Sequence, residues 1–192
     1  MYKLLVLTLL FCATASRCSK SRTYLTDEEK GWNPYKKGQT IIFKSEGLLD
    51  SIFIEDVLYK FPDGIGAMKY EFACVYARHH DPRENNAYSN TYILDIEAKY
   101  EKQPSSVEFS LKAKSSLFFN KRYTFTELKE LQEIELSVPY KLFNDVIVIK
   151  SQGDYSDNEF AIKTIYWSKS TGYIRFDKYD GTRWELVDII EP

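Results

Sequence analysis

Beyond residue 38 the chain consists of short apolar or alternating runs that are separated by turn-forming residues. Breaks recur roughly every eight to twelve residues, which is the spacing of an all-β sandwich or barrel. Parallel strands would need long connecting helices, and only residues 126–133 could form one short helix. The pattern therefore predicts one antiparallel β domain over residues 38–192, a sandwich or a barrel of about 9–11 strands. The runs span residues 40–44, 49–61, 67–78, 91–100, 106–113, 117–125, 134–138, 146–150, 160–168, 173–178 and 182–190.

The run over residues 67–78 alternates most clearly. One face would carry the larger and less polar side chains and the other face Lys69 and Glu71, as expected of a half-buried strand. On this pattern Cys74 is a buried thiol. The less polar face comprises Met68, Tyr70, Phe72, Cys74 and Tyr76.

The last strands form a hairpin whose register follows from its turn. Residues 179–181, Tyr-Asp-Gly, suit a three-residue loop in which Gly181 takes the left-handed conformation. Phe176 then faces Trp184 on the inner face, and Asp177 faces Arg183 on the outer face. A two-residue loop would place apolar residues opposite charged ones, so we predict the three-residue register.

The preceding connection predicts a second hairpin, with residues 170–172 as the loop. Tyr166 would then face Phe176 in the interior, and Trp167 would lie outside against Arg175. An outward tryptophan beside an arginine indicates a possible binding surface formed by Trp167 and Arg175. The alternative is that Trp167 is a rim residue that covers its own sheet.

The first 17 residues have the character of a secretory leader. Lys3 precedes an uncharged, mostly apolar run over residues 4–16, which is too short to cross a bilayer as a helix. Two endings are possible: cleavage after Ala15, or removal of residues 1–17 and attachment of a lipid to Cys18. We prefer lipidation. Residues 18–37 would then be a tether, with Trp32 and Tyr35 docking on the domain.

Composition and charge narrow the function classes. The net charge is −2, so no overall basic field recommends a nucleic-acid partner. The 15 Tyr, 12 Phe and 3 Trp favour strands over helices. In a β protein, such aromatic residues belong mainly to core packing and cross-strand pairs.

Motifs for catalysis are lacking in the sequence. Neither a phosphate-binding loop nor a serine-hydrolase elbow nor a zinc-protease helix motif occurs. His79 and His80 are adjacent, and consecutive residues of an extended segment point to opposite sides, so they do not converge on a metal. The acidic residues at 154, 157 and 159 do not follow the EF-hand spacing. We therefore expect no enzyme activity, no cofactor and no metal site.

Both ends of the chain resemble a known group. Residues 24–35, which include Trp-Asn-Pro-Tyr at 32–35, lead to the run Gly-Gln-Thr-Ile-Ile-Phe-Lys-Ser at 38–45, and residues 165–169, 172–176 and 180–186 form the ending. These segments resemble small uncharacterised β-rich envelope lipoproteins of the Bacteroidota; Arg17 departs from the small residue expected before the lipidated cysteine. The resemblance implies an outer-membrane lipid anchor and a β-rich fold, but no reaction. Residues 19–22 lack an acidic run resembling an export signal, which favours the periplasmic side.

The sequence is compatible with three functions. The first is a non-catalytic cell-envelope lipoprotein with a structural or protein-binding role, which predicts a filled interior and an exposed aromatic patch. The second is a lipocalin-like carrier, which predicts an apolar cavity of about 300 Å³ or more. The third is a hydrolase of envelope polymers, which predicts converging carboxylates in a cleft.

Overall fold

The computed structural model describes residues 22–62, 70–80, 88–113, 116–151 and 161–192. The leader, Cys18 and the acidic loop at 154–159 lie outside these ranges. The described residues form two short helices and eleven strands, which are α2 (Asp27–Lys30), β1 (Thr40–Ser45), β2 (Leu48–Lys60), β3 (Phe72–His80), β4 (Tyr88–Glu97), β5 (Ser106–Ala113), β6 (Ser116–Thr124), α3 (Phe125–Glu130), β7 (Ile134–Ser137), β8 (Leu142–Lys150), β9 (Ile162–Ser168), β10 (Gly172–Lys178) and β11 (Arg183–Ile190).

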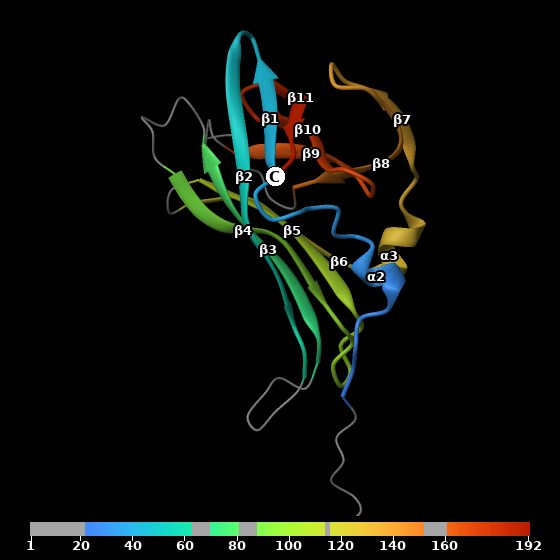
Figure 1. Cartoon of the computed structure of the whole chain (residues 1–192). Helices are drawn as coiled ribbons and strands as arrows, with labels where there is room; N and C mark the ends of the chain where they lie inside the picture. The colour runs from blue at the N-terminus through green and yellow to red at the C-terminus, as the bar shows by residue number, and fades with distance from the viewer. Residues whose placement is uncertain (1–21, 63–69, 81–87, 114–115, 152–160) are drawn as a thin grey trace, which may run out of the picture.

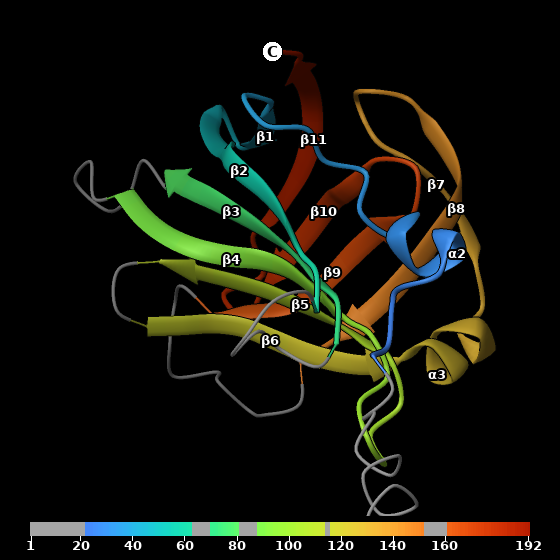
Figure 2. The ribbon, with the colours of Figure 1, turned by 60° about the horizontal axis from the view of Figure 1, so that its bottom comes forward.

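All the strands belong to one antiparallel sheet, in the order β6-β5-β4-β3-β2-β1-β11-β10-β9-β8-β7. The sheet curls into a half-barrel, as Figures 1 and 2 show, and α3 lies on the link between its two edge strands. The predicted all-β class and strand number are confirmed, as a single curled sheet. The structure adds one helix to the single helix expected, because Thr26 and Glu29 form a capping box at the start of α2.

Aromatic rings occupy the concave side of the sheet. Trp167 contacts Tyr173, Phe109 and Tyr35 edge-to-face, with ring centroids 4.9, 4.8 and 5.7 Å away. The Tyr173 hydroxyl donates a hydrogen bond of 2.9 Å to the Ile93 carbonyl, so it links β10 to β4 across the interior. This cluster ties the two halves of the half-barrel together.

The hairpin of β10 and β11 has the predicted register. Phe176 pairs with Trp184, and Asp177 pairs with Arg183. Gly181 has a φ of 88°, which is the left-handed conformation that the three-residue loop requires. The rings of Phe176 and Trp184 stack at 6.0 Å with an interplanar angle of 12°.

The predicted register between β9 and β10 is wrong. Trp167 pairs with Tyr173, because the turn spans residues 169–171 and not 170–172. Arg175 pairs with Tyr166, because the register shifts between Tyr173 and Arg175. Ile174 is the extra residue at this bulge, and it places Trp167 and Arg175 on opposite faces of the sheet. Trp167 is fully buried, so the expected outward tryptophan is wrong.

Strand β3 turns its smaller side chains towards the core. Ala73, Val75 and Ala77 belong to the buried hydrophobic cluster, whereas Tyr76 lies on the convex face. The face predicted to be inward is therefore the outward one. Cys74 is nonetheless buried, as expected, and is a free thiol.

The described part of the predicted tether packs on the domain. Trp32 and Tyr35 are buried, as expected of docking residues. Glu71, expected on a polar face, is fully buried and fixes this segment: its Oε2 accepts a hydrogen bond of 2.9 Å from the Leu25 amide. Its Oε1 lies 3.0 Å from the Lys30 ammonium. Residues 22–37 thus contribute to the core.

Candidate functional site

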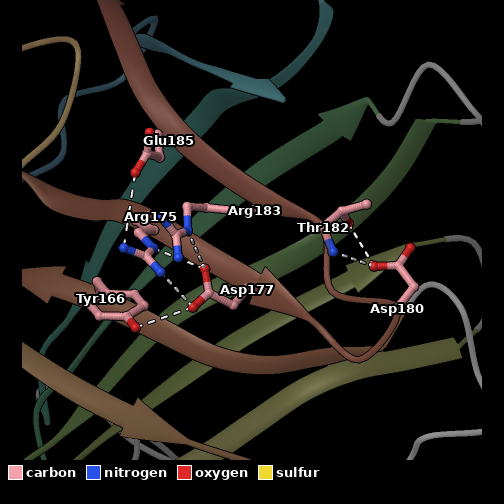
Figure 3. Close-up of polar contacts among 7 residues, drawn as sticks. All are labelled: Tyr166, Arg175, Asp177, Asp180, Thr182, Arg183 and Glu185. Atoms are coloured by element: carbon pink, nitrogen blue, oxygen red, sulfur yellow. Dashed lines mark hydrogen bonds and ion pairs between the residues drawn. The ribbon is translucent and has the colours of Figure 1, made fainter. Parts of the chain in front are cut away.

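The outer faces of β9, β10 and β11 carry a polar network centred on Arg175 (Figure 3). Its guanidinium donates two parallel hydrogen bonds to Asp177, of 2.9 and 2.8 Å, and it lies 4.4 Å from the centre of the Tyr166 ring. Tyr166 donates to the same carboxylate at 3.1 Å. Arg183 and Glu185 complete the network with ion pairs of 3.7 and 3.9 Å.

This network is a structural element rather than an open site. Arg175 is only 8% exposed, and its bidentate geometry is the strong form of an arginine–carboxylate pair. Burial, and next the charge of Asp177, raise the pKa of Tyr166. Trp167 lies on the concave face and Arg175 on the outer face, so the structure does not bring the two predicted residues together.

The convex face of β2, β3 and β4 presents an exposed aromatic surface. Phe53 and Tyr92 are 38% and 44% exposed, respectively. The rings of Tyr76 and Tyr92 lie 4.1 Å apart and their hydroxyls are hydrogen-bonded. The Arg78 guanidinium lies 5.8 Å from the centre of the Phe53 ring and pairs with Glu55. We call Phe53, Tyr76, Arg78 and Tyr92 the convex patch.

A row of charged side chains crosses the sheet beside the convex patch. Asp95 pairs with Cys74 on one side and with Glu108 on the other. Burial, and next the charge of Glu97, raise the pKa of Asp95 to about 6. Arg122 forms ion pairs of 2.8 Å with both Glu97 and Glu108. Asp95 can therefore take up a proton just below neutral pH, next to the patch.

A groove with a volume of about 600 Å³ lies between α2, α3, β8 and the β9–β10 turn. Its apolar part includes Trp32 and Leu128. Lys169 lies 5.3 Å from the centre of the Trp32 ring, and Lys129 forms an ion pair of 3.0 Å with Glu28. The groove therefore combines an indole with charges of both signs at its rim.

Among the residues that the structure describes, Cys74 has no nucleophilic role that its geometry supports. Burial raises the pKa of Cys74 to about 11, so the thiolate that a nucleophile needs is disfavoured. Within the described ranges, no three histidine, cysteine or carboxylate side chains gather as metal ligands. In the same residues, no helix has the length and apolar character needed to cross a bilayer.

The sequence interpretation missed the convex patch. Phe53 stands between Ile52 and Ile54 in a continuous apolar run, and such a run does not reveal which face is exposed. The signal available was the alternation itself: if Ile52 and Ile54 point inward, Phe53 points outward.

The chain was also compared with known proteins. No family model, no curated protein and no solved structure matches it significantly.

Proposed function

We propose that this protein is a non-catalytic cell-envelope lipoprotein that binds another protein through the convex patch. In this proposal, a lipid on Cys18 anchors the protein to the outer membrane, with the periplasmic side favoured. The observation that carries the binding role is the exposure of Phe53 on β2 and Tyr92 on β4, the two strands that flank β3.

The composition of the convex patch supports a protein partner. Tyrosine and arginine are enriched at the energetic centres of protein interfaces, because they bury a large area and keep a polar group for hydrogen bonding. Tyrosine also loses little conformational entropy on binding, and the contact between Tyr76 and Tyr92 orders both rings beforehand.

The alternative is a lipocalin-like carrier of a small apolar ligand. The groove beside α2 and α3 supports it, because about 600 Å³ lies within the range of small-molecule sites. Ile147, which lines the groove, pairs with the buried Trp167, so the groove borders the packed aromatic interior of the half-barrel. Solvent extraction of the purified protein, followed by mass spectrometry, tests this alternative: a stoichiometric apolar compound would favour the carrier.

Site-specific photo-crosslinking in cells of the source organism tests the protein-binding role. A photoreactive amino acid replaces Tyr92 in one variant and Tyr140 in the control, since Tyr140 is similarly exposed, at 39%, and lies in the β7–β8 turn. We expect a discrete crosslinked protein from position 92 only. The same products from both positions, or none from position 92, would contradict the proposal.

A further inference from the structure

One end of the half-barrel gathers the start of the described chain, the end of β2 and the β4–β5 connection (Figures 1 and 2). Thr23 forms a parallel bridge to Tyr70, and the Tyr70 ring lies 5.1 Å from the ring of Tyr100 in that connection. Lys60, at the end of β2, pairs with Phe72 at the start of β3. Three segments that are distant in the sequence thus meet at this end.

Aromatic and basic residues are prominent among the exposed side chains at this end. Tyr24 and Phe61 are 49% and 54% exposed. Lys60, Lys99 and Lys102 are also exposed, and Glu101 is the acidic residue placed between the last two. We call this group of two aromatic residues and three lysines the anchor end.

Aromatic side chains and lysines together match the chemistry of a membrane surface. Amphipathic rings such as tyrosine settle at the level of the headgroups, and lysines place their alkyl stems on apolar surface while the ammonium stays in water. Anionic phospholipids attract each basic residue near the surface. A nucleic-acid partner would need a larger basic surface around the exposed Phe61 ring than this end offers.

The position of the chain start relates this end to the bilayer. The described chain begins at Arg22 in the anchor end, and Cys18 is four residues earlier. Four extended residues span at most about 14 Å, so a lipid on Cys18 would hold the anchor end at the headgroups. We propose that the anchor end itself docks on the headgroup region of a bilayer that contains anionic phospholipid. This inference rests on the proposed lipidation of Cys18.

Depth-dependent fluorescence quenching tests the inference. The mature protein from a secretion-competent bacterium is placed in vesicles of equal parts phosphatidylcholine and phosphatidylglycerol, with and without brominated acyl chains. Phe61→Trp puts a reporter in the anchor end. Tyr140→Trp is the matched control, because the β7–β8 turn lies at the opposite end of the molecule (Figure 1). The wild-type emission, from three largely buried tryptophans, is subtracted.

We expect brominated lipid to quench the reporter at position 61 and to leave the reporter at position 140 unaffected. The double variant Lys99→Glu/Lys102→Glu should lower the ratio of docked to undocked protein by at least about fivefold at each position, because each substitution removes a positive charge and adds a negative one. Equal quenching at both positions, in protein that floats with the vesicles, would overturn the inference and leave the lipid anchor intact. Protein that does not float with the vesicles would overturn both.

Discussion

Gly172 offers a sharp test of how the N-terminal segment is docked. Gly172 has a φ of 92°, and a Cβ added there would overlap the ring of Tyr35. Tyr35 is buried, its hydroxyl accepts a hydrogen bond of 2.9 Å from the Tyr173 amide, and it contacts Trp167. Gly172→Ala must therefore displace Tyr35, in addition to straining the backbone.

The expected loss of folding stability in Gly172→Ala is the sum of these two contributions. A left-handed conformation costs an alanine about 1–2 kcal/mol. Expelling a buried aromatic ring adds a loss comparable to a large-to-small core substitution, about 3 kcal/mol or more. The total is at least about 4 kcal/mol, and for a chain of this size each kcal/mol lowers the melting temperature by about 2–4 °C. We expect a decrease of about 10 °C or more.

Gly47→Ala is the matched control. Gly47 has nearly the same φ, 89°, but nothing lies within 4 Å of the added Cβ. The Gly47→Ala variant should therefore lose only the stability that the backbone strain costs, about 1–2 kcal/mol. Differential scanning calorimetry measures both variants, and a third measurement places Gly172→Ala in a Tyr35→Ala background. There the steric conflict has gone, so the alanine should cost no more than in the control. Equal losses at Gly172 and Gly47 in the wild-type background would refute the docking of Tyr35.

Three further predictions concern the sheet. Trp184→Ala should cost about 3–5 kcal/mol, because the indole is buried against Phe176; a melting temperature close to that of the wild type would mean that the side chain lies outside. Exchanging Asp177 and Arg183 looks neutral from their pairing alone, but should cost about 3 kcal/mol in urea unfolding, because Arg175 loses its carboxylate; a neutral exchange would contradict the network in Figure 3. Asp95 has a folded pKa of about 6, above its unfolded value of 3.8, so the folded state gains stability as the pH falls through 6 and this gain is complete below 3.8. Asp95→Asn should therefore stabilise the protein at pH 7 by about 1–2 kcal/mol, after allowance for partial exposure, and have less effect at pH 4; an equal effect at both would exclude this titration.

Local chemistry made part of the fold predictable. The β10–β11 hairpin followed from a turn whose glycine must be left-handed and from cross-strand pairs that only one register satisfies. The β9–β10 register did not follow, because an extra residue at Ile174 leaves no mark in the alternation. The orientation of Trp167 was therefore predicted wrongly as well.

Other features depend on contacts between segments that are distant in sequence. The inward face of β3 carries Ala73 and Ala77, on a concave side where the Tyr173 side chain reaches across to β4. The size and hydrophobicity of the β3 side chains alone predicted that the opposite face would point inward. Glu71 likewise gave no signal, because its partners Leu25 and Lys30 come from a segment expected to be a tether. The convex patch was hidden for the same reason, since its members belong to three strands.

The proposed lipidation of Cys18 is central to both the proposed function and the further inference. Mass spectrometry of the N-terminus of the mature protein, made in a bacterium with a lipoprotein pathway, tests it most directly. We predict a chain that begins at Cys18 and carries the added mass of a diacylglyceryl group. An unmodified chain that begins at Ser16 would contradict the account.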